Sequence, residues 1–216
     1  MSIKFYYGSG SPYAWRVWLA LEHKKLSYEM NQLSFSNDDL MKPEFLALNP
    51  RHKVPVIINN GFVLYESAAI VEYLEDLSPH AGQPLFAEDV EARAIARRLI
   101  READQYMANA LEMMAVEIFF KAQDQWQLET IEAGRSGFVA ELDYFERTLP
   151  QEEFLVGAVG AADFTVYPLI ALARRIDIKK PDLNIGSAIG PKVSAWMKRV
   201  EELPYFETTI PPHWKG

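Results

Sequence analysis

The feature that most constrains the fold is a change of pattern near residue 80 of this 216-residue chain. Before that point, short runs of β-forming residues alternate with amphipathic runs, and after it the pattern is helical. The first part predicts the order β-α-β-α-β-β-α. Its expected strands and helices cover 3–7, 14–24, 27–33, 43–48, the two sides of Asn60-Gly61, and 67–77. Asn-Gly is the dipeptide that a type I′ hairpin turn prefers.

The segment SPHAGQPLF at 78–86 contains two prolines and a glycine and ends the mixed pattern. We therefore predict a domain over 1–80, a linker over 81–88 and an all-helical domain over 89–216. The second domain is expected to begin with one long helix, because apolar residues recur three or four positions apart. These residues are Ile95, Leu99, Ala103, Met107, Leu111 and Met114. Further helices are expected at about 129–148, 163–176 and 189–202.

Composition excludes several classes of function. The formal net charge is −8 and no block of Lys and Arg is long enough to follow a phosphate backbone, so we expect no nucleic-acid partner. No apolar run approaches the roughly 18 residues that span a bilayer, and the N-terminus lacks a signal-peptide pattern. We expect no membrane association and a cytoplasmic location.

The chain has no cysteine, so any thiol chemistry requires a thiol from outside. It also lacks HExxH, GxGxxG and the phosphate-binding loop with Lys-Ser/Thr. The four histidines lack metal-ligand spacing, and no metal site is expected.

Ser11-Pro12 has two interpretations. Serine is a favoured N-cap and proline a favoured first helical residue, so the pair starts a helix without any further role. A hydroxyl at a helix N-terminus is also well placed to stabilise an anion, since the free N–H groups and the helix dipole favour negative charge there.

Val54-Pro55 lies before an expected strand and is most simply an edge or strand-start proline. A cis bond there would instead turn the backbone groups of Val54 outward, so that an extended peptide could pair with them. Glu66-Ser67 also has two interpretations. Ser67 can start a helix beside an acidic residue, or its hydroxyl and the first helical N–H groups can bind a carboxylate while Glu66 accepts an ammonium group.

Three motifs in order carry a resemblance to a known family. They are Ser-Pro-Tyr-Ala-Trp-Arg-Val from residue 11, Asn49-Pro50-x-x-Lys53-Val54-Pro55-Val56, and Tyr65-Glu66-Ser67-x-Ala69-Ile70. Together they resemble the cytosolic glutathione S-transferases, and in particular the serine-type branches such as tau, zeta and theta. The resemblance implies an α/β thioredoxin-like N-terminal domain (βαβαββα) followed by an all-α C-terminal domain.

The resemblance also implies roles for individual residues. Ser11 would donate a hydrogen bond to the sulfur of the co-substrate glutathione, with Tyr13 as a substitute or as part of the electrophile pocket; Tyr6, Tyr7 and Ser9 also compete for the sulfur. Val54, before Pro55, would pair with the cysteinyl backbone, and Glu66 and Ser67 would hold the γ-glutamyl group. Lys53 would face the glycine carboxylate, with His52 as a weaker candidate; a solvated lysine and a surface histidine are the ordinary alternatives.

The implied reaction is transfer of glutathione to a small, mostly apolar electrophile, as in detoxification, by a homodimer. Met107, Leu111 and Met114 would line the electrophile site or, more ordinarily, belong to the core. The alternatives are a non-catalytic interaction or regulatory protein of the same fold, and a glutathione-dependent isomerase, lyase or peroxidase. One departure from the family is Gly160, where a Ser or Thr cap is usual before Asp163; we expect Asp163 to be structural.

Overall fold

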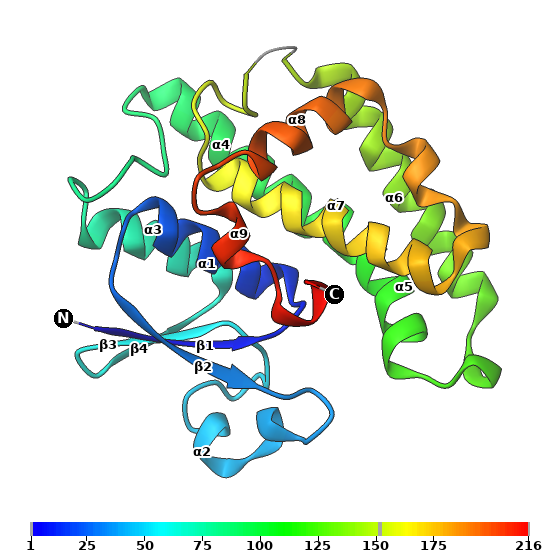
Figure 1. The fold of residues 1–216 in the computed structure, drawn as a ribbon, viewed down its shortest axis with the longest axis horizontal. Helices are drawn as coiled ribbons and strands as arrows, with labels where there is room; N and C mark the ends of the chain where they lie inside the picture. The colour runs from blue at the N-terminus through cyan, green and yellow to red at the C-terminus, as the bar shows by residue number, and fades with distance from the viewer. Residues whose placement is uncertain (1, 151–152, 216) are drawn as a thin grey trace. The chain divides into compact units, whose positions relative to one another are not determined.

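The computed structural model describes residues 2–150 and 153–215, which form two compact units (Figure 1). One unit contains the chain up to Ala87 together with the chain from Leu203 onward, and the other contains Glu88–Glu202. The predicted second domain ran from 89 to the C-terminus. The observed and predicted divisions of the chain therefore differ mainly in the segment from Leu203 onward, which packs with the α/β unit.

The first unit is built on a four-stranded sheet in the order β2-β1-β3-β4. The strands are β1 (Ile3–Gly8), β2 (Tyr28–Leu33), β3 (Val56–Asn59) and β4 (Phe62–Tyr65). β1 is parallel to β2 and antiparallel to β3, and β3 and β4 form an antiparallel hairpin. Asn60 and Gly61 both have positive φ, 51° and 84°, which confirms the predicted type I′ turn.

Helices cover both faces of this sheet, because β1 alternates its side chains between two apolar layers. On one face lie α1 (Pro12–His23) and α3 (Ser67–Leu77), and the ring of Tyr7 packs 5.5 Å from that of Trp18 of α1 (Figure 1). On the other face the short α2 (Pro43–Leu46) contributes Phe45, which packs with Tyr6 and Val56. The predicted α/β thioredoxin-like order is thus confirmed.

The last segment adds a short helix, α9 (Phe206–Thr209), against α1. Thr209 is fully buried, and its hydroxyl accepts a hydrogen bond of 2.9 Å from the indole nitrogen of Trp15. This buried bond between residues almost 200 positions apart explains why the segment belongs to the first unit.

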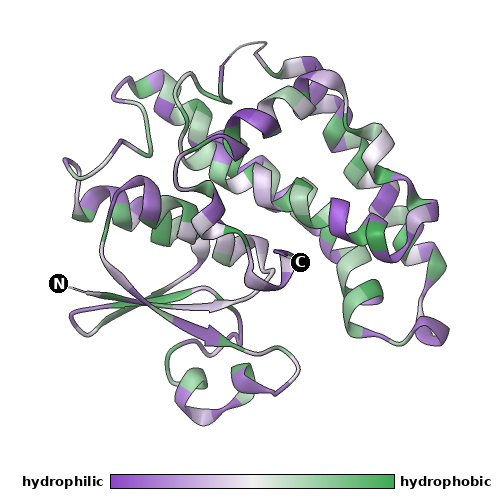
Figure 2. Ribbon diagram, in the orientation of Figure 1, coloured by the Kyte–Doolittle hydropathy of each residue, from purple (hydrophilic) through white to green (hydrophobic). Residues whose placement is uncertain are grey.

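The second unit is all-helical, as predicted. Its helices are α4 (Val90–Glu102), α5 (Ala108–Phe120), α6 (Leu128–Thr148), α7 (Ala161–Lys179) and α8 (Pro191–Glu201). A π-helical turn, Ala103–Met107, joins α4 to α5 into the long helix that the apolar stripe predicted. Hydrophobic and hydrophilic residues alternate along these helices (Figure 2). In the described parts of the chain, no helix combines the length and the apolarity needed to cross a membrane.

The methionine stripe belongs to the core of this unit. Met107 and Met114 have no exposed surface and Leu111 is 2% exposed. The suggestion that these three residues line an electrophile site is therefore wrong, because the side of the helix that they occupy packs against α6 and α7. The more ordinary interpretation holds.

Asp163, in the first turn of α7, is fully buried and accepts three hydrogen bonds. The donors are the backbone N–H groups of Leu155 and Gly160, at 3.0 and 2.9 Å, and the indole nitrogen of Trp196, at 2.8 Å. Gly160 lacks the hydroxyl of a Ser or Thr cap, but the other half of the capping box is retained, because the carboxylate of Asp163 accepts from the N–H of Gly160. Asp163 has the structural role that its position predicted.

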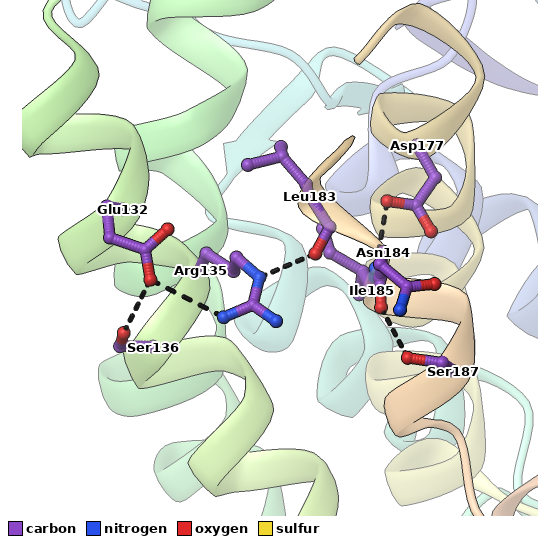
Figure 3. Close-up of polar contacts among 8 residues, drawn as sticks. All are labelled: Glu132, Arg135, Ser136, Asp177, Leu183, Asn184, Ile185 and Ser187. Carbon is purple, nitrogen blue, oxygen red and sulfur yellow. Dashed lines mark hydrogen bonds and ion pairs between the residues drawn. The ribbon is translucent and has the colours of Figure 1, made fainter. Parts of the chain in front are cut away.

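A second carboxylate organises the loop between α7 and α8. The side chain of Asp177 accepts hydrogen bonds from the N–H groups of Ile185 and Gly186, at 2.9 and 2.6 Å. Arg135 of α6 donates from Nε to the carbonyl of Leu183, which ties the same loop to a neighbouring helix (Figure 3). These contacts hold the loop without any ligand.

Candidate functional site

The end of β1 and the start of α1 present the hydroxyl of Ser11. The backbone turns at Gly10, whose φ is +86°, and the N–H of Ser11 donates to the carbonyl of Gly8 at 3.1 Å. Ser11 is then the N-cap of α1, and its Oγ accepts a hydrogen bond of 3.3 Å from the N–H of Ala14. The capping interpretation is therefore correct. Accepting this bond leaves the hydroxyl proton able to donate to a ligand.

The other side chains considered for the sulfur have partners within the protein. The hydroxyl of Tyr7 donates to Gln32 at 3.0 Å, and burial raises the pKa of Tyr7. The ring of Tyr6 packs against Phe45 on the opposite face of the sheet from α1. The Oγ of Ser9 lies 2.6 Å from Nδ1 of His213.

Tyr13 occupies the first turn of α1 and is half-buried. The guanidinium carbon of Arg16 lies 5.8 Å from the centre of its ring, within the range of a cation–π contact. Tyr13 follows Ser11 closely along the chain, and its ring is held by this neighbour.

The loop before β3 is organised by a residue whose role the sequence did not reveal. Asn49 is 2% exposed; its amide nitrogen donates to the carbonyl of Lys53 at 2.7 Å, and its amide oxygen accepts from the N–H of Arg51 at 3.0 Å. Asn49-Pro50 was interpreted only as a helix stop. A polar residue between an expected helix and an expected strand was the available signal, because a buried amide must find partners.

This loop delivers Val54 and Pro55 to the start of β3. The Val54-Pro55 bond is cis, as the second interpretation of that motif required. Pairing of β3 with both β1 and β4 begins only at Val56, so Val54 lies outside the ladders. Its backbone groups can therefore pair with an extended ligand.

The two basic candidates beside Val54 are both exposed. The carbonyl of Lys53 is fixed by Asn49, so the start of its side chain is fixed too. His52 has a positive φ of 57°, and its Nδ1 lies 2.9 Å from the sulfur of Met41. His52 thus has a neighbour within the protein, in agreement with the surface-histidine interpretation.

The start of α3 differs from the simplest expectation. Glu66, not Ser67, occupies the N-cap position; it has φ +72° and ψ 105° and makes no side-chain capping bond. Ser67 is the first helical residue and is 7% exposed. A non-glycine residue in such a backbone conformation is unusual and tends to occur at functional sites.

Helical bonding in α3 begins with the N–H of Ile70, which donates to the carbonyl of Glu66 at 2.9 Å. The N–H groups of Ser67, Ala68 and Ala69 precede this bond and point out of the helix end. Together with the helix dipole they favour an anion, while the exposed carboxylate of Glu66 favours a cation beside it.

The strand register brings the three motifs together. Tyr6 of β1 pairs with Val56 of β3, and Val56 pairs with Tyr65 of β4. The turn that follows β1, the loop that precedes β3 and the start of α3 therefore meet at the same end of the sheet. Ser11, Val54 and Ser67 therefore lie at one end of the sheet of the first unit.

Within residues 2–150 and 153–215, no group of three or more His, Cys, Asp and Glu side chains is arranged to hold a metal ion. What the site offers is a hydroxyl donor at one helix end, an unpaired extended backbone and an anion-binding second helix end. Such a set can bind an extended peptide-like molecule and stabilise a negative charge on it.

Known proteins resemble this chain over both of its units. Residues 10–77 match the model of the glutathione S-transferase N-terminal domain, and residues 107–204 match that of the C-terminal domain. A probable maleylacetoacetate isomerase from Caenorhabditis elegans is 32% identical over 207 residues, which cover 92% of this chain and 88% of that protein. A glutathione S-transferase from Silene vulgaris is 29% identical, covering 97% of each chain.

Solved structures show the same fold. The crystal structure of a glutathione S-transferase from the Antarctic clam Laternula elliptica has a TM-score of 0.80 and 28% identity, covering 99% of this chain and 94% of that one. The two domain matches, the relatives that span nearly the whole chain and the shared fold lead to one conclusion: this chain belongs to the glutathione S-transferase family.

Proposed function

We propose that this chain is a serine-type glutathione transferase that binds glutathione on its first unit and activates the glutathione thiol with Ser11. The observation that carries the proposal is the hydroxyl of Ser11, which caps α1 through a single 3.3 Å bond and retains a proton to donate. The family's co-substrate is a thiol, and this chain has no cysteine of its own.

The energetics of thiol activation are within reach of this site. A free thiol has a pKa of about 8.5, so only a few per cent is thiolate at neutral pH, and the thiolate is the nucleophile. Lowering the pKa by about two units requires about 2.7 kcal/mol in favour of the anion. One hydrogen bond to a charged acceptor contributes about 1.5 to 3 kcal/mol, and the N-terminus of α1 adds to it.

The remaining parts of glutathione have matching partners in the proposal. The backbone of Val54 pairs with the cysteinyl residue in the manner of an added strand. The hydroxyl of Ser67 and the first N–H groups of α3 bind the γ-glutamyl carboxylate, and Glu66 accepts its ammonium group. Lys53 faces the glycine carboxylate, with His52 as a further candidate.

Calorimetry with millimolar glutathione tests the binding part of the proposal. We expect saturable binding by the wild-type protein. The natural control is an S-methyl derivative of glutathione, which keeps the backbone and loses the ionisable thiol: it should bind without proton release. A protein indifferent to glutathione would contradict the proposed function.

The substrate class is the next question. We propose a small, mostly apolar electrophile, supported by apolar side chains exposed on and beside α5, namely Tyr106, Met113 and Val116. Turnover against a panel of aryl halides, hydroperoxides and maleyl compounds would identify the reaction. Aryl-halide or other addition products support transfer to an electrophile.

A second candidate is a glutathione-dependent isomerase. It is favoured by the 32% identity to the Caenorhabditis elegans protein named as a probable maleylacetoacetate isomerase. In the same panel, turnover of maleyl compounds with no net consumption of glutathione would favour this reaction. We also propose a cytoplasmic homodimer, as the family resemblance implies; sedimentation of the purified protein should give about twice the mass of one chain.

A further inference from the structure

The C-terminal segment, residues 203–215, contacts the chain on both sides of Ser11. Before Ser11, the Oγ of Ser9 lies 2.6 Å from Nδ1 of His213. After Ser11, the indole of Trp15 donates to Thr209 and packs edge-on against Trp214, with 5.3 Å between ring centres. The proposed catalytic hydroxyl is thus bracketed by contacts from a segment almost 200 residues away in sequence.

The C-terminal segment also restricts the space around Gly10, the residue between Ser9 and Ser11. Gly10 has φ +86°, a conformation that a glycine adopts easily and leaves easily. A Cβ at this position would lie only 2.9 Å from Cε1 of His213. The imidazole therefore packs directly on Gly10.

The two hydrogen bonds of His213 together show whether Ser9 or His213 is the donor in the bond between them. The indole nitrogen of Trp214 lies 2.9 Å from Nε2 of His213, and an indole nitrogen can only donate. Nε2 is therefore the acceptor, and in the neutral ring the proton is on Nδ1. Nδ1 then donates to the Oγ of Ser9.

Donation from His213 to Ser9 excludes a role for the pair as a serine nucleophile with a histidine base. A histidine that activates a serine must accept the serine's proton, and its Nδ1 here carries a proton already. Ser9 and His213 do not form a nucleophile and base. Their hydrogen bond is suited to holding the turn.

We propose that His213 is a positioning residue for Ser11: its hydrogen bond to Ser9 and its packing on Gly10 hold the turn so that the Ser11 hydroxyl points at the thiol. The inference rests on the proposed function of Ser11. Small displacements matter at such a site, because a hydrogen bond to a developing or bound anion depends steeply on donor position.

The test compares His213→Ala with His80→Ala, the same change at an exposed histidine just after α3. In protein saturated with glutathione, His213→Ala should raise the pKa of the bound thiol by about half a unit and lower kcat about threefold to tenfold, with little change in the KM for glutathione. His80→Ala should match the wild type. His213→Asn, whose amide nitrogen can replace Nδ1 as the donor, should recover part of the loss.

A double-mutant cycle assigns the effect to the bond. Ser9→Ala should reproduce the part of the His213→Ala shift that the hydrogen bond contributes, and the double variant should show no more than His213→Ala alone, because that bond is already lost in it. Additive shifts, or a thiol pKa in His213→Ala equal to that of the wild type, would overturn the assignment.

A readout without glutathione separates this inference from the proposed function. Hydrogen exchange of the amides of residues 8–15 in the free protein should rise about tenfold in His213→Ala and stay unchanged in His80→Ala. If wild-type protein fails to bind glutathione, the proposed function is lost, and the exchange result still decides whether His213 holds the turn. Equal exchange in the wild type and His213→Ala would refute that role.

Discussion

The helix N-termini of the two units are completed in different ways. In the second unit, protein carboxylates supply acceptors at the starts of α4, α7 and α8, whereas α6 starts without a side-chain capping bond. Asp89 caps α4 at 2.7 Å, Asp163 caps α7, and Glu146 accepts from the N–H groups of Lys192 and Val193 of α8, at 3.0 Å each. In the first unit, α1 begins with one 3.3 Å bond to Ser11, and α3 begins at Glu66 without a side-chain capping bond.

The presence or absence of a carboxylate cap from the protein distinguishes structural helix ends from helix ends that can bind a ligand. Free N–H groups at a helix start need an acceptor, and a carboxylate from the same chain provides it permanently. Where the chain provides none, a carboxylate or thiolate of a ligand can do so. The proposed glutathione site lies at two helix starts of the first unit, α1 and α3, for which no carboxylate cap is found among the described residues.

The largest effect is expected from removing a protein acceptor. Asp163→Ala leaves the N–H groups of Leu155 and Gly160 and the indole of Trp196 without their partner in a buried region. We expect the free energy of unfolding to fall by about 3 to 5 kcal/mol, measured by urea denaturation. Ser67→Ala, measured in the same way without ligand, should change it by less than about 1 kcal/mol.

If the two substitutions had equal effects on stability, the distinction between structural and ligand-binding helix ends would be lost. Should Asp163→Ala fail to accumulate as folded protein, Asp163→Asn provides a second variant, because its amide oxygen retains one acceptor. It should be intermediate in stability.

Titration of Asp163 should change the free energy of unfolding slightly less than the Asp163→Ala substitution does. Burial raises the pKa of Asp163 from 3.8 to about 6, although its hydrogen bonds act in the opposite direction. The folded protein therefore holds this proton to higher pH than the unfolded chain does. As pH rises from about 4 to about 6, the contribution of Asp163 to the free energy of unfolding should fall, by about 3 kcal/mol in full.

Other carboxylates titrate in the same range, so the measurement is a difference between proteins. Urea denaturation at several pH values should show this fall in the wild type and not in Asp163→Asn. The same slope in both proteins would mean that Asp163 is not the group responsible.

A carboxylate introduced into the first turn of α3 should turn its N-terminus from a proposed ligand-binding helix end into a structural one. Ala69 is exposed in the first turn of α3, three residues after the N-cap, where a glutamate completes a capping arrangement. Ala69→Glu should stabilise the ligand-free protein by about 0.5 kcal/mol and weaken glutathione binding about 30-fold, through repulsion of the γ-glutamyl carboxylate.

Ala69→Gln is the matched control, since it has the same size and no charge. It should retain most of the affinity in calorimetry. Equal weakening by Glu and Gln would point to steric exclusion and remove the electrostatic explanation.

The smallest expected effect belongs to the hydroxyl of Ser67. Ser67→Ala removes one donor to the carboxylate and leaves the backbone N–H groups, so we expect the Kd for glutathione to rise about tenfold. Ser78→Ala, at the other end of the same helix, should leave the Kd unchanged. An unaltered Kd in Ser67→Ala would exclude its hydroxyl from the site.

The sequence predicted the local parts of this molecule well. Ser11-Pro12 starts α1, Asn60-Gly61 forms the hairpin turn, and Ser67 is the first residue of α3. In each case the information lies in residues next to one another, since caps and tight turns are decided by local hydrogen bonds and allowed φ angles.

Features decided by tertiary contacts were not accessible in this way. Glu66 has a positive φ at the position where β4 is joined to α3, and the role of Asn49 depends on which backbone groups the 49–53 loop brings to its side chain. The last segment was predicted with the helical domain, because nothing near Thr209 indicates that its hydroxyl will meet Trp15. The stripe containing Met107 and Met114 was ambiguous because an apolar helix face suits a core and a pocket equally.

The central claim is that the first unit stabilises a thiolate through Ser11, and the pKa of bound glutathione tests it most directly. Thiolate absorbance of the saturated protein is followed against pH in the wild type and in Ser11→Ala. We predict a bound-thiol pKa about two units below that of free glutathione in the wild type, and a return of one unit or more towards the free value in Ser11→Ala. The same pKa in both proteins, or a wild-type value equal to that of free glutathione, would contradict the claim.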